Sequence, residues 1–288
     1  MLDLRGCGTA LVTPFRNGEV DYETYASLVD RQVRGGVDFL VPLATTGETP
    51  ALSVEEKLEL LKLTRAHSAG RPLLVGCGSN ALESTLANMR LLEGEADAFL
   101  VVVPFYNKPT QQGQYEYFKA VAASTPKPVV IYNVPGRTGA NMTAETCVRL
   151  ANDCPNIIAT KEASGNYAQV SEILRTAPEG FNVLSGDDDM TFAFMCTGAA
   201  GVISVASNAV PEMVSGMVHF LLDGKVGEAR ELHHRLSPLF KACFIESNPI
   251  PVKALMEYQG LMSAEVRLPL SRACAATGEK ITSVYKAL

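Results

Sequence analysis

The chain has 288 residues, a formal net charge of −6 and an apolar content of 47%. This length suits one large barrel of alternating strands and helices, which typically needs about 250 residues. Lys and Arg are scattered without a basic stripe, so nucleic acid is not expected as a partner. No window approaches the roughly 18 uninterrupted apolar residues of a membrane-spanning helix, so no membrane span is expected.

The N-terminal residues 1–6 lack the apolar stretch of a signal peptide. The seven cysteines are scattered and form no Cys-x-x-Cys pair. Scattered thiols without a leader indicate a reducing, cytoplasmic compartment rather than a disulfide framework or a zinc site. Most of the cysteines are expected to be small buried apolar residues.

Strand-like and helix-like segments alternate along the chain, and each strand-like run leads into a helical pattern. The apolar runs end near Val12, Leu43, Gly76, Val103, Tyr132, Thr160, Ser185 and Val205. The clearest helical patterns cover residues 21–35, 53–69, 81–93, 111–124, 143–151, 166–176, 188–198 and 211–222. Several runs are almost continuously apolar, which is typical of parallel strands buried on both faces. Eight such units predict a (β/α)8 TIM barrel, with an open doubly wound sheet as the alternative.

The strand signal ends near residue 225. Residues 228–244, 249–260 and 270–288 read as helices, and Pro249, Pro251 and Gly260 suit the start and the end of the second. We therefore predict a catalytic barrel over residues 1–224 and a three-helix C-terminal extension over residues 225–288.

Lys161 ends a short apolar run and is the most informative residue. Because the strand is buried, desolvation is expected to lower the pKa of its amine and leave a nucleophile that can attack a carbonyl. The structural alternative is a strand-end lysine paired with Glu162 or with a helix C-terminus. Lys108 also follows a strand and is a rival nucleophile, but its Asn-Lys-Pro context is turn-like and predicts exposure to water.

The ends of other strands carry groups that suit chemistry on a carbonyl compound. Tyr132 and Thr45 could relay the protons that imine formation requires. Arg137, after a Pro-Gly turn, offers a planar fork for a carboxylate. A core tyrosine and a surface arginine are the structural alternatives for these two positions. In a barrel these residues converge at one end, which predicts a carbonyl substrate that bears a carboxylate.

Two motifs indicate other classes of protein. Residues 187–189 are three aspartates, which suit a hard metal or, more simply, the start of a helix near Met190. Residues 76–81 match the loose pattern G-x-G-x-x-(G/A), and Asp97 lies near the spacing of a ribose contact, which would suit a nucleotide-dependent oxidoreductase. The structural alternative is a tight turn with Asn80 capping the third helix. We expect neither a metal nor a nucleotide.

Three motifs in order along the chain resemble one family: Thr45-Thr46-Gly47-Glu48, Tyr132-Asn133-Val134-Pro135-Gly136-Arg137-Thr138-Gly139 and Lys161-Glu162-Ala163-Ser164-Gly165-Asn166. They resemble the N-acetylneuraminate lyase superfamily of Schiff-base class I aldolases, and within it the dihydrodipicolinate (4-hydroxy-tetrahydrodipicolinate) synthase family. The likeness extends to residues 104–109, 184–188, 201–205 and 248–253. It covers nearly the whole chain, and the Arg137 motif carries the narrower family assignment.

The resemblance implies catalytic roles for four residues. Lys161 would form the imine with pyruvate. Tyr132, Thr45 and Tyr106 would form a proton relay, with Tyr106 contributed by a neighbouring subunit.

The resemblance also implies four substrate-binding positions. Thr46 would bind the pyruvate carboxylate, and Arg137 the carboxylate of the second substrate, L-aspartate 4-semialdehyde. The main chain of Ile203 would line the pyruvate site, and Gly186 would shape its floor. No cofactor is implied beyond the covalent imine on Lys161. The family is typically a homotetramer of two tight dimers.

Two further properties depend on single positions: the choice of the second substrate and the response to lysine. A pyruvate aldolase acting on N-acetylneuraminate or a 2-keto-3-deoxy sugar acid shares Lys161 and Tyr132 but generally lacks the pair Arg137 and Tyr106. Feedback-sensitive relatives bind lysine through two histidines, a glutamate and a tyrosine, where this chain has Val54, Lys57, Ser84 and Phe105. A cationic side chain there would repel lysine, so weak or absent inhibition is expected.

Overall fold

The computed structural model describes residues 2–288. Eight parallel strands form its main sheet: β1 (Gly6–Ala10), β4 (Phe39–Val41), β5 (Leu74–Gly76), β6 (Ala98–Val102), β7 (Val129–Asn133), β8 (Ile157–Glu162), β9 (Asn182–Ser185) and β10 (Gly201–Ser204). The strands β2 (Phe15–Arg16) and β3 (Glu19–Val20) form a short antiparallel hairpin.

Each parallel strand is followed by a helix, and three further helices end the chain. The helices are α1 (Tyr22–Arg34), α2 (Val54–His67), α3 (Leu82–Leu92), α4 (Gln111–Ala123), α5 (Pro135–Thr138), α6 (Ala144–Asp153), α7 (Tyr167–Thr176), α8 (Thr191–Cys196), α9 (Pro211–Leu222), α10 (Val226–Ala242), α11 (Ile250–Tyr258) and α12 (Ala275–Lys286). This is the predicted (β/α)8 barrel with a three-helix C-terminal extension. No helix within residues 2–288 is long and apolar enough to cross a membrane.

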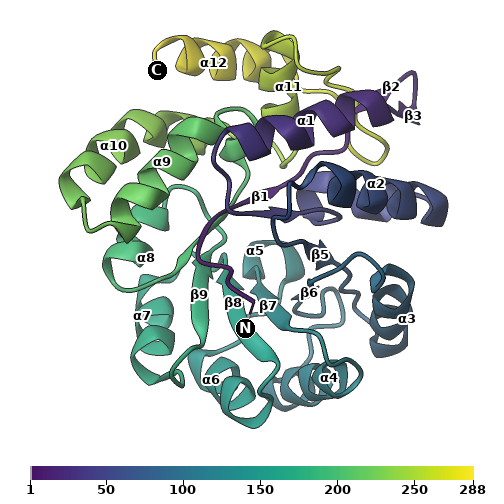
Figure 1. The fold of residues 1–288 in the computed structure, drawn as a ribbon, viewed down its shortest axis with the longest axis vertical. Coiled ribbons are helices and arrows are strands. Elements are labelled where there is room, and N and C mark those ends of the chain that lie inside the picture. The colour runs from purple at the N-terminus through teal and green to yellow at the C-terminus, as the bar shows by residue number, and fades with distance from the viewer. Residues whose placement is uncertain (1) are drawn as a thin grey trace. The chain divides into compact units, whose positions relative to one another are not determined.

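The chain divides into two compact units. The first contains the segment up to Arg5 and residues Leu74–Ile203. Its strands are hydrogen-bonded in the order β10-β9-β8-β7-β6-β5, and helices α3, α4, α6 and α7 lie outside them (Figure 1). Strand β7 is buried throughout, as expected for a parallel strand covered on both faces.

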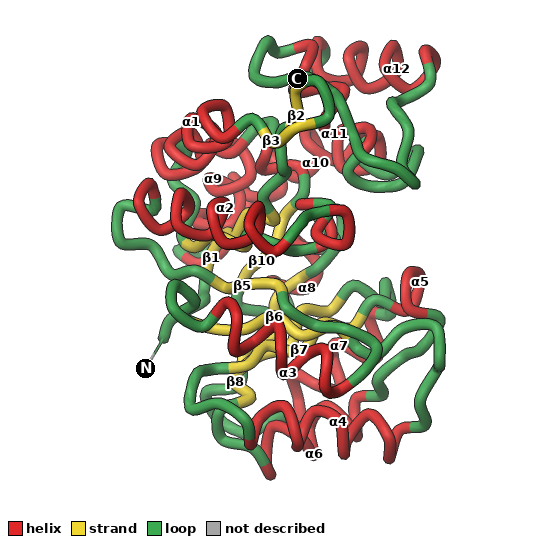
Figure 2. The backbone as a smooth tube through the Cα atoms, turned by 90° about the vertical axis from the view of Figure 1, so that its right-hand side faces the viewer, coloured by secondary structure: helices red, strands yellow, loops and turns green. Residues whose placement is uncertain are grey.

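The second unit contains Gly6–Leu73 and Ser204–Leu288. Strand β1 pairs in parallel with β4, and α1 packs on α2. The turn of the β2–β3 hairpin donates backbone hydrogen bonds from Asn17 and Gly18 to Glu265, and Figure 2 shows the hairpin next to α11. The predicted boundary between residues 224 and 225 stays a prediction.

Local sequence signals explain where most helices begin. Ser53 and Glu56 form a capping box at the start of α2, and the side chains of Asp21, Thr110 and Thr143 cap α1, α4 and α6. Pro249 precedes the first residue of α11, and the left-handed Gly260 follows its end, as predicted.

Three local predictions are wrong. The last helix begins at Ala275 rather than 270, because the backbone N–H of Cys274 is bonded to the Glu246 carboxylate instead of a preceding carbonyl. The helix predicted over residues 188–198 is also shorter than expected: the Asp187 side chain accepts from the N–H of Asp189 in a turn, so α8 starts at Thr191. Ala81, without a side-chain bond, takes the N-cap position of α3 that was assigned to Asn80.

Candidate active site

Lys161 lies one residue before the end of β8, and its side chain is buried. Its register partner on β7 is Tyr132, and its Nζ lies 4.2 Å from the centre of the Tyr132 ring. Gly186, directly after β9, leaves space for Ala163 and for the lysine, because a Cβ at that position would lie 2.7 Å from Ala163 Cβ and 3.1 Å from Lys161 Cε. The three neighbouring strands therefore bring together the amine, the phenol and the glycine that the sequence selects.

Burial lowers the pKa of the Lys161 amine from 10.5 to about 7. The Asp188 carboxylate opposes this shift and raises the pKa, whereas the Arg137 guanidinium lowers it. A lysine with this pKa has about half of its population as the free, nucleophilic amine at pH 7. The arrangement therefore has the electrostatic character expected of an imine-forming lysine.

Asp188 is a residue whose contribution the sequence did not reveal. The three aspartates were interpreted as a metal site or a helix start, but the N-cap of α8 is Met190 without a side-chain bond. Asp188 is 2% exposed, and its charge acts on Lys161. Within residues 2–288, no group of three or more His, Cys, Asp or Glu side chains is arranged to hold a metal ion.

The Glu162 carboxylate does not serve as the partner of Lys161. Successive side chains of a strand point to opposite faces, so these two neighbours diverge. Glu162 instead accepts hydrogen bonds from Ser164 Oγ at 2.7 Å, Asn133 Nδ2 at 2.9 Å and Gln169 Nε2 at 3.3 Å. Burial raises the pKa of the Glu162 carboxyl, and these three hydrogen bonds act in the opposite direction.

Arg137 lies on the short helix α5 that follows β7, and its side chain is exposed. Tyr106, after β6, donates its backbone N–H to the carbonyl of Thr138 at 3.3 Å, which links the two loops. Tyr106 is 87% exposed and has a left-handed backbone with φ of 71°. The first unit thus holds the proposed carboxylate-binding arginine and an exposed phenol on connected loops.

Ile203 is buried in β10, which pairs with β9. Lys108, the rival nucleophile, is exposed, whereas Lys161 is buried. Exposure leaves an ammonium hydrated, so the structure favours Lys161 over Lys108 as the reactive amine.

The glycine-rich turn after β5 has a packing explanation. A Cβ on Gly78 would lie 2.6 Å from the backbone nitrogen of Val102 on β6. The close approach of this turn to β6 therefore accounts for the glycine.

Thr45 and Thr46 belong to the second unit and form the turn η1 (Thr45–Gly47) after β4. Thr45 is exposed, whereas Thr46 is buried and its Oγ1 accepts a hydrogen bond from Asn248 Nδ2 at 2.9 Å. Two non-glycine residues with left-handed backbones, Leu43 and Glu48, flank this turn. Such backbones are unfavourable for residues with a Cβ and persist only where surrounding contacts fix them.

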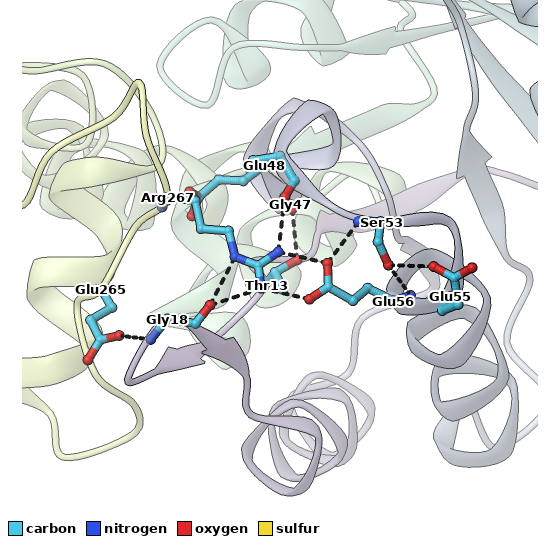
Figure 3. A network of polar contacts seen from close by, with 10 residues as sticks. Thr13, Gly18, Gly47, Glu48, Ser53, Glu55, Glu56, Glu265 and Arg267 are labelled. Atoms are coloured by element: carbon cyan, nitrogen blue, oxygen red, sulfur yellow. Dashed lines mark hydrogen bonds and ion pairs between the residues drawn. The ribbon is translucent and has the colours of Figure 1, made fainter.

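Glu48 supplies those contacts. Its buried carboxylate pairs with Lys253 Nζ at 2.6 Å and accepts the backbone N–H of Arg267 at 2.9 Å. The Arg267 side chain in turn binds Glu56 and the carbonyl of Gly18 (Figure 3). The C-terminal extension therefore fixes the turn that carries the two threonines.

Comparison with known proteins identifies the family. A model of the dihydrodipicolinate synthetase family matches residues 3–288. The 4-hydroxy-tetrahydrodipicolinate synthase of Parabacteroides distasonis is 46% identical over 290 aligned positions, which cover 100% of this chain and 98% of the relative.

Solved structures agree with this match. The dihydrodipicolinate synthase of Thermotoga maritima superposes with a TM-score of 0.96 at 43% identity, covering 98% of this chain and 97% of the other. The chloride-inhibited enzyme of Acinetobacter baumannii, solved with pyruvate, gives a TM-score of 0.96 at 34% identity and covers 99% of each chain. The chain therefore belongs to the dihydrodipicolinate synthetase family.

Proposed function

We propose that this chain condenses pyruvate with L-aspartate 4-semialdehyde to give 4-hydroxy-tetrahydrodipicolinate, the entry step of diaminopimelate and lysine biosynthesis. The observation that carries the proposal is the buried Lys161 amine, with a pKa of about 7, beside Tyr132 and the space left by Gly186. Membership of the family supports the choice of substrates.

The reaction begins when the Lys161 amine attacks the C2 carbonyl of pyruvate, and loss of water gives an imine. Removal of a C3 proton gives an enamine, whose C3 attacks the aldehyde carbon of the second substrate. The amino group of that substrate then attacks the imine carbon and expels the lysine amine. The ring closes, the enzyme is regenerated, and one water is released overall. Because the imine itself activates pyruvate, we expect no separate cofactor.

Tyr132, Thr45 and Tyr106 are proposed to carry protons between the amine, the hydroxyl that leaves as water and the solvent. The position of Tyr132 beside Lys161 supports its place in this relay. The 87% exposure of Tyr106 suits a side chain that completes the site of a neighbouring copy, as the family resemblance implies. We accordingly propose a homo-oligomer, specifically a tetramer formed by two tight dimers.

Binding of the two carboxylates is proposed to fall to Thr46 and Arg137. Thr46 would bind pyruvate through its hydroxyl and backbone, and the exposed fork of Arg137 would receive the carboxylate of the aldehyde. The main chain of Ile203 would line the pyruvate site, and Gly186 would form its floor.

The cytoplasm is the proposed compartment. None of the seven cysteines forms a disulfide within residues 2–288, and five of them are buried. Thiols in the reduced state suit a reducing environment.

A two-acceptor assay tests the function. The protein is incubated with pyruvate and either L-aspartate 4-semialdehyde or N-acetylmannosamine, and pyruvate consumption is followed. Consumption with aspartate semialdehyde alone is the expected result. Consumption with the sugar alone would keep Lys161 as the imine lysine but would refute the acceptor and the pathway.

A further inference from the structure

Glu162 has no role in the proposed reaction, yet its carboxylate is buried immediately after Lys161 in the chain. Its side chain is bonded across the strands to Asn133, the register partner of Glu162 on β7. Asn133 is fully buried, and its Nδ2 donates to Glu162 Oε1 at 2.9 Å. A buried hydrogen bond to a carboxylate is short and directional, so it fixes both side chains.

Asn133 also closes the segment 134–142, which contains Arg137. Asn133 directly precedes this segment, and its Oδ1 accepts from the backbone N–H of Met142 at 3.0 Å. Its Nδ2 donates to Asn141 Oδ1 at 2.9 Å and lies 3.3 Å from the carbonyl of Met142. The single Asn133 side chain therefore joins the two ends of the segment.

Neighbouring helices hold the same end of the segment. Asn141 Nδ2 donates to Gln169 Oε1 at 2.8 Å, and Gln169 Nε2 in turn contacts Glu162. From α4, Gln111 Nε2 donates to the carbonyl of Asn141 at 2.7 Å. The base of the segment is thus fixed to β8, α7 and α4, while Arg137 remains exposed.

We propose that Glu162 and Asn133 are positioning residues that hold the Arg137 segment in a fixed place relative to Lys161 and so determine affinity for the carboxylate of the aldehyde substrate. This inference rests on the proposed function and on the role proposed there for Arg137. The pair acts through Arg137 and contacts neither substrate.

Three variants test the pair. Asn133→Asp keeps the size of the side chain and the acceptor for Met142 but places a carboxylate against Glu162. The double variant Asn133→Asp/Glu162→Gln reverses donor and acceptor, and so restores one hydrogen bond between the two positions. Leu92→Ala is the matched control, since it removes a buried side chain from α3 that takes no part in this network.

Four quantities are measured on each purified full-length variant: the KM for aspartate semialdehyde, the pyruvate concentration that half-saturates borohydride-trapped adduct, the melting temperature, and the amide hydrogen exchange of residues 134–142. For Asn133→Asp we expect the aldehyde KM to rise about tenfold or more, with half-saturating pyruvate within about twofold of wild type. Amide hydrogen exchange in residues 134–142 should become faster. The double variant should recover much of the aldehyde KM, and Leu92→Ala should lower the melting temperature without a change in KM.

A purely structural role for Glu162 and Asn133 would give different results in these measurements. A lower melting temperature with an unchanged aldehyde KM, or an equal loss for both substrates, would overturn the positioning role. Failure of the double variant to recover any aldehyde affinity would do the same. Should Asn133→Asp not fold, Asn133→Ser removes the contacts without adding charge and is judged by the same measurements. If the wild-type protein traps no pyruvate, the proposed function fails, and the exchange data still report whether the pair holds the segment.

Discussion

The rate of imine formation should depend on pH with a midpoint near 7, because the reactive form of Lys161 is the free amine. Burial lowers the pKa of this amine from 10.5 to about 7. At pH 7 about half of the lysine is then free amine, compared with roughly one part in 3,000 for an unshifted lysine. The sign is fixed: below the midpoint the ammonium cannot attack, so the rate falls as the pH is lowered.

The assay is the initial rate of pyruvate attachment, trapped with borohydride and followed by intact mass, from about pH 5.5 to about pH 9.5. Lys161→Ala provides the control and should show no adduct. Two further variants should move the midpoint in opposite directions. Asp188→Asn removes a charge that raises the pKa of Lys161 and should lower the midpoint, whereas Arg137→Ala removes a charge that lowers it and should raise the midpoint.

A rate that continues to rise up to about pH 10 would show that the reacting lysine keeps its ordinary pKa, and would refute the burial argument. Adduct on Lys161→Ala would show that a different lysine reacts. If the midpoint moved in the same direction in the Asp188 and Arg137 variants, the charges of these two residues would not act on the pKa of Lys161 as the structure indicates.

Three further outcomes are expected. Arg137→Ala should raise the KM for aspartate semialdehyde by roughly 10- to 100-fold, because it loses a charge-assisted carboxylate contact; an unchanged KM in steady-state kinetics would remove this arginine from the site. Gly186→Ala should cost about 1–3 kcal/mol in a denaturant titration and slow adduct formation, because its Cβ would lie 2.7 Å from Ala163 Cβ and 3.1 Å from Lys161 Cε; unaltered trapping would show that the space beside the lysine is not needed. Lysine at about 1 mM should inhibit by less than half, because Lys57 would repel it; stronger inhibition in the same assay would contradict this.

The sequence predicts the barrel because parallel strands leave a strong pattern. Strand β7 is apolar in four of its five residues and buried throughout, and the eight strands end within a few residues of the predicted positions. The wrong helix starts lie where a side chain, rather than a backbone carbonyl, accepts the hydrogen bond of a backbone N–H. Cys274 is bonded to Glu246, 28 residues earlier, and no local pattern reports a contact of that kind.

In the candidate site, too, a residue could be predicted from its own segment, whereas contacts between distant segments could not. Lys161 could be predicted as the reactive amine because the apolar pattern of its own strand indicates that it is buried. Burial is the largest cause of its lowered pKa. Asp188 could not be assigned its influence, since its run of aspartates equally suits a helix start. The role of Glu48 in fixing the turn that bears Thr45 and Thr46 could not be predicted either, because its partner Lys253 lies 205 residues later in the chain.

Strand geometry explains how Lys161 and Glu162 can be adjacent without neutralising each other. Alternation places the two side chains on opposite faces of β8. Were the Glu162 carboxylate on the same face, its charge would stabilise the ammonium and raise the pKa of Lys161, as Asp188 already does in part. Bound to Asn133 and Ser164 instead, Glu162 leaves burial dominant at the amine while it anchors the neighbouring loop. One strand therefore supplies the proposed nucleophile on one face and, on the other, the carboxylate that holds the neighbouring loop.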